Sequence, residues 1–217
     1  MLQLRITQKF AKDLKLKKLP NPNPVDSILD DWVIDLIRVQ RRKVAMVTHV
    51  KTLMTFYIPY KDVGGVNNVP EAIGVKLSQW LCKHGFSDLG EQALKLFQEK
   101  PFFCKTDHRK VLGHMNEFKW CIGWCMEDMS FDQIDWQDIL DRILYMPVKT
   151  IGSGFSMPAE LMFELLGDKA KFEYYYKMAS ERISKKVKER EKFHRRKYVL
   201  ISSGYGESLA KHNITWH

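Results

Sequence analysis

Many features that mark a known class of protein are absent from this 217-residue chain. No apolar run approaches the ~20 residues that a membrane-spanning helix needs. The first ten residues lack the apolar stretch and small-residue cleavage site of a secretory signal. The chain also has no phosphate-binding glycine loop, dinucleotide-binding turn, nucleophile elbow, HExxH segment or aspartate-rich cluster. We therefore expect a cytoplasmic protein without a cofactor, and no motif indicates a chemical reaction.

Cysteine is scarce as well, with four residues at positions 82, 104, 121 and 125. They form no CxxC pair, so neither a disulfide framework nor a zinc ribbon is indicated. Cys121 and Cys125 would share a helix face, and a metal site can be drawn from them with His108 and His114. The alternative is that these cysteines are small buried hydrophobic residues. We favour that alternative and expect no metal.

The net charge of +9 is unevenly distributed along the chain. Between residues 182 and 197, nine Lys and Arg residues are opposed by Glu189 and Glu191, so this segment carries +7 and the rest of the chain +2. A nearly neutral body with a basic appendage is indicated. The nine cations are Arg182, Lys185, Lys186, Lys188, Arg190, Lys192, Arg195, Arg196 and Lys197.

Short segments rich in β-branched and aromatic residues dominate the first part of the chain. Residues 32–39, 43–49 and 52–60 read as strands joined by short turns, which predicts an antiparallel meander with residues 2–7 as a further strand. Helical spacing of apolar residues follows and is clearest over residues 132–145. We therefore predict an α+β fold, in which a small antiparallel sheet is covered by helices.

A last helix is predicted to begin near residue 168. Its apolar positions recur at helical spacing only as far as residue 187, beyond which the same face is charged. We expect this helix to dock along its first half and to project its second half. The predicted division is a globular domain over residues 1–167 and a C-terminal basic helix and tail over residues 168–217.

Residues 106–120, TDHRKVLGHMNEFKW, gather several side chains that can carry chemistry. In a catalytic interpretation, Arg109 binds an anion, a histidine (His108 or His114) is the general base, and Glu117 is its partner. These residue types suit phosphodiester chemistry, because an arginine stabilises developing negative charge while a histidine moves protons.

The same stretch has a structural interpretation. Gly113 would let the chain turn, His114 or Asn116 would cap a helix beginning there, and Arg109 would pin the preceding loop. We favour this interpretation, with a ligand contact at Arg109.

A basic turn is predicted at residues 40–43, QRRK, between the first two strands of the meander. Two strands joined by a basic tip can contact nucleic acid, which makes Arg41 and Arg42 candidates for phosphate contacts. The alternative is a charged hairpin tip that is simply solvated.

The basic segment near the C-terminus is the stronger signal. Its cations would release condensed counterions on meeting a nucleic-acid backbone, and Phe193 and Tyr198 could stack on unpaired bases. An acidic protein partner, or a helix that is only solvated, remains open.

Ten positions in the chain resemble a family of bacterial proteins catalogued only as a domain of unknown function. The likeness covers about residues 1–166 and departs at His49 and His114, so it implies no histidine mechanism. It also implies no established activity. The positions that carry it are Trp32, Arg41, Arg42, Lys43, Arg109, Val111, Leu112, Gly113, Met115 and Asn116.

Together these features favour a non-enzymatic intracellular binding protein that contacts nucleic acid through its basic C-terminal helix. One alternative is an enzyme acting on nucleic acid or a nucleotide, centred on Arg109, His114 and Glu117. A second alternative is a protein-interaction or inhibitor subunit of a mobile-element or defence system.

Overall fold

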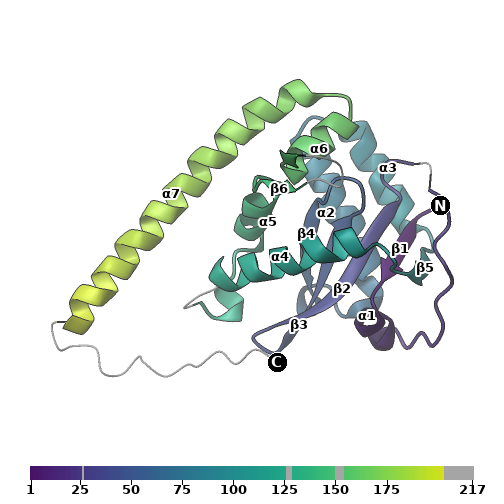
Figure 1. Cartoon of the computed structure of the whole chain (residues 1–217), viewed down its shortest axis with the longest axis horizontal. Coiled ribbons are helices and arrows are strands. Elements are labelled where there is room, and N and C mark those ends of the chain that lie inside the picture. Colours follow the sequence, from purple (N-terminus) through teal and green to yellow (C-terminus); the bar gives the residue numbers. More distant parts are fainter. Residues whose placement is uncertain (26, 126–128, 150–153, 203–217) are drawn as a thin grey trace.

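The computed structural model describes residues 1–25, 27–125, 129–149 and 154–202, and within them the main sheet has five strands in the order β4–β3–β2–β1–β5. The predicted α+β class is confirmed (Figure 1). A small second ladder is formed by β6 (Val148–Lys149) and β7 (Phe155–Ser156). The main strands are β1 (Gln3–Ile6), β2 (Asp31–Val39), β3 (Arg42–His49), β4 (Thr55–Pro59) and β5 (Phe102–Lys105).

The sheet is mixed, and in this respect the prediction of an antiparallel sheet needs correction. Strands β2, β3 and β4 form the expected antiparallel meander. Strand β1 runs parallel to both of its neighbours, β2 and β5. The physical reason is that the chain leaves the end of β1 through a helix and a long loop and re-enters the sheet in the same direction, which is how parallel strands must be connected.

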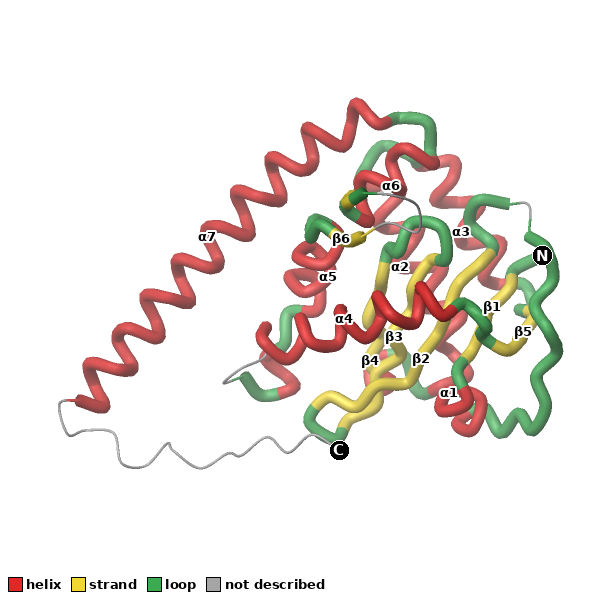
Figure 2. The backbone as a smooth tube through the Cα atoms, viewed as in Figure 1, coloured by secondary structure: helices red, strands yellow, loops and turns green. Residues whose placement is uncertain are grey.

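Helices cover both faces of the sheet. In Figure 1, α4 crosses in front of the strands while α2 and α3 lie behind them, and the tube in Figure 2 follows the same layers. The α-helices are α1 (Gln8–Asp13), α2 (Val69–Lys83), α3 (Ser87–Gln98), α4 (Arg109–Cys125), α5 (Trp136–Leu144), α6 (Pro158–Leu165) and α7 (Lys169–Ser202). Short 3-10 turns are η1 (Tyr60–Asp62), η2 (Val66–Asn68) and η3 (Phe131–Gln133).

The alternation of each strand divides the core into two clusters, because successive side chains point to opposite faces. Trp32 and Ile34 of β2 join the cluster that packs under α2, α3 and α6. Val33 and Ile37 of the same strand join the other cluster, under α4 and part of α5. A buried face on each side fixes the register of the strand, since a slip of one residue would exchange the two sets.

A close approach of α2 and α3 depends on two glycines. A Cβ at Gly74 would lie 2.5 Å from Phe97 Cβ, and one at Gly90 would lie 2.6 Å from Cys82 Sγ. Any larger residue would force the helices apart, so their spacing is set by these positions.

The last helix, α7, packs on the body through its first half, as predicted. Phe172 is 5% exposed and Ala179 3%, whereas Val187 is already 36% exposed. The Tyr175 hydroxyl donates to the carbonyl of Lys83 at 3.2 Å, which ties α7 to the end of α2. Figure 1 shows the second half of α7 extending away from the body. Nowhere in the described ranges is there a helix long and apolar enough to cross a membrane.

Candidate functional site

Two of the predicted cations of α7 are held by acidic residues of α5. Arg182 forms an ion pair with Asp141, and Lys186 Nζ lies 2.7 Å from Asp135 Oδ2 and 3.3 Å from Asp138 Oδ1. Burial opposes the charge of Lys186, but the hydrogen bond and charge of its acidic partners outweigh it and raise its pKa. Arg182 and Lys186 therefore help to fix α7 on the body.

Other cations of α7 are directed to solvent. Lys185 and Lys188 are exposed, and neither has an ion-pair partner among the residues that the structure describes. The remaining predicted cations lie on α7, but their side chains fall outside the described part of the structure. They are Arg190, Lys192, Arg195, Arg196 and Lys197.

At the β2–β3 tip, the two predicted arginines differ in their surroundings. Arg42 donates to both carboxylate oxygens of Asp132, at 3.0 and 3.3 Å, and its guanidinium lies 4.9 Å from the Phe131 ring centroid. Lys61 pairs with the same carboxylate. Arg42 thus clamps η3 to the hairpin. The guanidinium of Arg41 is exposed and has no partner within the described residues.

The stretch 106–120 is not a turn followed by a helix, and the predicted capping roles are wrong. Helix α4 begins at Arg109, and the His108 carbonyl accepts the first hydrogen bond, from Leu112 N at 3.1 Å. Gly113 is therefore inside the helix, where it neither turns the chain nor precedes a cap. Asn116 instead accepts a hydrogen bond from Lys119 Nζ at 2.9 Å.

The three candidate catalytic residues are only partly brought together. His114 Nδ1 lies 3.2 Å from Glu117 Oε2, one turn along α4. Arg109 precedes His114 by five positions, which directs the two side chains about 140° apart around the helix axis. Arg109 is exposed, and no ion pair of its guanidinium occurs in the described residues. The helix therefore separates the anion-binding residue from the pair that would move a proton.

Among the cysteines whose side chains are described, Cys104 is buried, Cys121 is half-buried and Cys82 is exposed, so the predicted burial is confirmed for Cys104 and is wrong for Cys82. Burial raises the pKa of the Cys104 thiol to about 11, so this thiol is protonated at neutral pH. Cys121 Sγ lies 3.6 Å from Met146 Sδ. The side chain of Cys125 lies outside the described residues. In the described ranges, no three His, Cys, Asp or Glu side chains are grouped to hold a metal ion.

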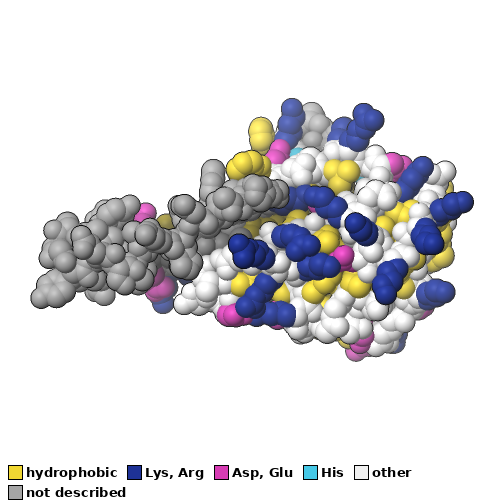
Figure 3. All heavy atoms as spheres, turned by 90° about the horizontal axis from the view of Figure 1, so that it is seen from below, with side chains coloured by type: hydrophobic (Ala, Val, Ile, Leu, Met, Phe, Trp, Pro, Cys, Tyr) yellow, Lys and Arg dark blue, Asp and Glu magenta, His cyan; other side chains and the backbone are white. Residues whose placement is uncertain are grey.

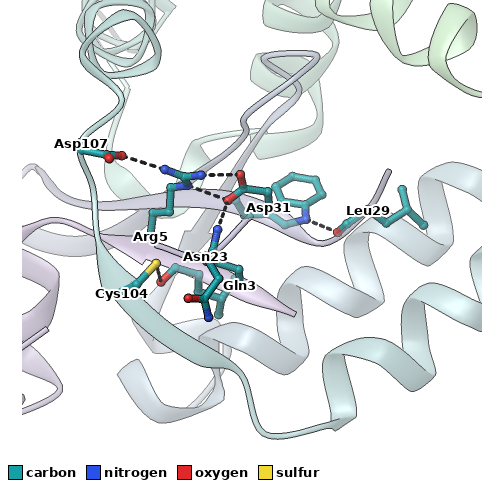
Figure 4. A network of polar contacts seen from close by, with 9 residues as sticks. Gln3, Arg5, Asn23, Leu29, Asp31, Cys104 and Asp107 are labelled. Carbon is teal, nitrogen blue, oxygen red and sulfur yellow. Dashed lines mark hydrogen bonds and ion pairs between the residues drawn. The ribbon is translucent and has the colours of Figure 1, made fainter. Parts of the chain in front are cut away.

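A polar network that the sequence analysis does not predict joins β1, β2 and the segment before α4, and it is buried at Gln3 and Asp31 but exposed at Asp107 (Figure 4). Arg5 Nε and Nη2 donate to the two oxygens of Asp31 at 2.8 and 2.9 Å, and Arg5 Nη1 donates to Asp107 Oδ1 at 2.7 Å. Gln3 donates to Asp31 at 3.1 Å and accepts from Asn23 N at 2.7 Å, which holds the proline-rich loop against the sheet.

The role of this network is structural, because it holds β1, β2 and the segment before α4 together. Burial works against the Arg5 charge, but the hydrogen bond and charge of Asp31 raise its pKa, so the guanidinium stays ionised. All three guanidinium nitrogens contact carboxylates, and both oxygens of Asp31 accept hydrogen bonds. The one signal in the sequence was the placement of Gln3 and Arg5 between apolar residues of a buried strand, which directs both to the same face.

Two histidines are buried and neutral. Burial lowers the pKa of His49 to about 4 and that of His84 to about 4. His49 Nδ1 contacts Thr52 Oγ1 at 2.8 Å beneath the Trp32 ring. The ring of His84 is stacked on Trp80 at 4.1 Å and also meets Tyr175 of α7 at 4.3 Å. Neither histidine is placed to exchange protons with a ligand.

The fold and these contacts define an α+β domain whose sheet is covered on both faces, with a long basic helix docked at one side. A family model described as "Domain of unknown function (DUF6933)" matches residues 3–161, and the chain belongs to this family. The resemblance to an uncharacterised domain family is thus confirmed, and the match ends before α7 begins. No curated protein and no solved structure matches the chain.

Proposed function

We propose that this protein is a cytoplasmic, non-enzymatic binding protein that contacts nucleic acid through the basic second half of α7. The observation that carries the proposal is that some cations of this helix have acidic partners on the body, while others are exposed. Arg182 and Lys186 form ion pairs with acidic residues at α5, while Lys185 and Lys188 face solvent without a partner among the described residues. The helix is therefore held in place by some of its cations and still presents others.

Phosphate is the ligand chemistry that such a helix suits. Cations on a fixed helix neutralise backbone phosphates and release condensed counterions, which supplies affinity without reading sequence. We expect binding that weakens steeply with salt and varies little with the sequence of the nucleic acid.

An acidic protein partner is the second candidate, and one observation favours it. Within the chain, α7 already pairs with an acidic helix, because Asp138 and Asp141 of α5 and its N-cap residue Asp135 all contact the cations of α7. A partner presenting a similar acidic helix would meet the same kind of surface.

The test is the salt dependence of binding to a labelled oligonucleotide, measured by fluorescence anisotropy on the full chain. With about five cations engaged, log K should fall against log salt with a slope of about −3.5 to −4.5. Replacing Lys185 and Lys188 by glutamine should flatten the slope by about 1.4 to 1.8, since two phosphate contacts are lost.

The matched control replaces Lys95 and Lys100, exposed lysines on and just after α3, and should leave the slope unchanged. If the α7 variant keeps the slope of the unmodified chain, or if no nucleic acid binds at moderate salt, the proposal fails. Binding of an acidic helical peptide in place of nucleic acid would favour the protein-partner candidate.

A further inference from the structure

Strand order brings two basic segments of the body to one end of the sheet. Because β1 and β2 are parallel, α1 follows β1 at the end where β2 continues toward its tip. Residues 8–18 carry +4 and residues 38–43 carry +4. The whole chain is +9 and residues 182–197 hold +7 of it, so the residues outside these three segments together carry −6. Outside residues 182–197 the net charge is thus close to neutral, as expected, but it is unevenly distributed over the body.

These segments lie at the same end of the sheet, and we call their cations, together with Lys61, the basic face. Its members are Lys9, Lys12, Lys15, Lys17, Lys18, Arg38, Arg41, Arg42, Lys43 and Lys61. Lys43 Nζ lies 2.8 Å from Asp13 Oδ2, which links β3 to α1, and Arg38 is directly opposite Lys43 in the β2–β3 ladder. Figure 3 looks at the underside of Figure 1, where α1 and the β2–β3 tip lie, and shows Lys and Arg side chains gathered there with few acidic ones between them.

Backbone strain marks two of these cations. Four non-glycine residues in the described ranges have positive φ, namely Lys15 (59°), Gln40 (46°), Arg41 (68°) and Leu53 (60°). Lys15 closes α1, where Leu16 N bonds to Ala11 O at 3.0 Å, and this left-handed position is usually glycine. Arg41 is the second residue of a two-residue hairpin turn, which also favours glycine.

The other two strained residues have tasks inside the fold. Leu53 is 1% exposed in the core, and the Gln40 amide donates to the carbonyl of Met129. The side chains of Lys15 and Arg41 make no such contact with any described residue. At two places on one face, the chain has a cation where folding alone favours glycine, and such uncompensated strain is typical of functional positions.

The shape and chemistry of the basic face select among polyanions. Single-stranded nucleic acid is usually bound with exposed aromatic rings on which bases stack. Here Phe131 is 4% exposed and Phe10 0%, and Tyr60, the ring nearest Lys43, is half-buried, so no fully exposed ring lies beside these cations among the described residues. A two-stranded ribbon fits the major groove of B-form DNA, whereas the major groove of A-form RNA is too deep and narrow for side chains to read.

We propose that the basic face binds double-stranded DNA, with the β2–β3 tip and Arg41 in the major groove and the lysines of α1 on the flanking phosphates. This extends the proposed function to a surface that α7 does not share. It is tested separately from α7, on the full chain.

The first test compares two triple variants in anisotropy titrations with a labelled DNA duplex. Lys9→Gln/Lys12→Gln/Arg41→Gln removes cations from the basic face. Lys51→Gln/Lys95→Gln/Lys100→Gln removes the same charge from exposed positions elsewhere. Each lost phosphate contact costs about eightfold in affinity at ~0.1 M salt, so the first variant should bind ~10- to ~500-fold more weakly. The second should bind as the unmodified chain does, and equal losses in the two variants would overturn the proposal.

The second test uses the strain itself. Lys15→Gly/Arg41→Gly should weaken DNA binding by more than tenfold at ~0.1 M salt, by the same counterion argument. Its melting temperature should be equal to or above that of the unmodified chain, because glycine relieves both left-handed positions. A variant that melts lower, or one that binds DNA normally, would show that the two cations serve the fold.

The remaining outcomes separate the two proposals and the kind of ligand. Loss of binding in the basic-face variant but not in Lys185→Gln/Lys188→Gln leaves the basic face standing and refutes the role of α7. The reverse result refutes the basic face. Tighter binding to an RNA duplex, to single strands, or to vesicles of anionic lipid would overturn the assignment to duplex DNA.

Discussion

The two basic regions of this molecule, α7 and the basic face, are unequal in ways that their charge does not reveal. On α7 the inner cations Arg182 and Lys186 contact three carboxylates, two on α5 and one on its N-cap residue Asp135. On the basic face, Arg42 and Lys61 share the single carboxylate of Asp132, so positive charge remains in excess. The number of cations in a sequence segment therefore does not give the number available to a ligand, because acidic residues from other elements pair with some of them and not with others.

The largest expected effect concerns the docked half of α7. A chain ending at Gly167 should still unfold cooperatively, but with a free energy of unfolding lower by about 3–5 kcal/mol, because the buried Phe172 is lost. A chain ending at Val187 keeps the docked residues and should lose less than ~1 kcal/mol. Thermal and urea melts compare them. Loss of cooperative unfolding in the longer chain would contradict this division of α7, as would an unchanged melt of the shorter one.

The pH dependence of stability tests the same docking through His84, whose ring contacts Tyr175 of α7. Burial lowers the pKa of His84 to about 4 from an ordinary 6.5, so between these values the unfolded chain binds more protons than the folded one. Stability from this group is complete above about pH 6.5 and is lost as the pH falls toward 4, by up to about 3 kcal/mol. His84→Phe should flatten part of the decline, leaving the part due to His49.

Melts at several pH values between neutrality and 4 measure that difference. The control is Lys95→Gln, an exposed residue of α3 that does not contribute to the pKa shift of His84, and it should keep the full decline. An identical pH profile for His84→Phe and the unmodified chain would mean that His84 is not the titrating group.

Ion pairing on α7 gives an intermediate effect. Arg182→Ala leaves the carboxylate of Asp141, 7% exposed, without its cation, and should cost about 1 kcal/mol after allowance for the exposure of Arg182. Lys185→Ala should change stability by less than ~0.5 kcal/mol. Adding Asp141→Asn to Arg182→Ala should recover part of the loss. If Arg182→Ala and Lys185→Ala lower the free energy of unfolding equally, the distinction between ion-paired and exposed cations of α7 is wrong.

The smallest effect is at the end of α1. Lys15→Gly should raise stability by about 0.5 kcal/mol, because glycine accepts the left-handed backbone but loses more entropy on folding. Lys12→Gly makes the same change of charge inside the helix and should lower stability by about 0.5–1 kcal/mol. Chemical denaturation of the two variants measures the change in the free energy of unfolding for each. A lower value for Lys15→Gly than for the unmodified chain would contradict the assignment of strain.

Local patterns predicted most of the elements, including the meander, the amphipathic α5 and the docking limit of α7. The parallel pairing of β1 with β5 was not predictable, since Gln3 pairs with Phe102 across most of the domain and no local signal marks such a contact. The predicted turn at Gly113 misplaces the start of α4, because a helix tolerates a glycine at a cost of about 1 kcal/mol.

The candidate site was predictable only where its residues are contiguous in the sequence. Charge counting located the α7 segment and the hairpin tip, because both are contiguous in sequence. It missed that Arg42 and Lys186 have acidic partners, at Asp132 and Asp135, which come from distant elements. It also missed the cations of α1 as part of a surface, since only the parallel strand order places them beside the tip.

The position of β1 between β2 and β5 sets an order on the assembly of the chain. During synthesis, β1 emerges before the other four strands of the main sheet, yet its second neighbour is complete only at Lys105. Until then one edge of β1 is open, and the network around Arg5 cannot close, because Asp107 follows β5. Closing so long a loop is entropically costly, so β5 should be the last strand of the main sheet to acquire protection from hydrogen exchange.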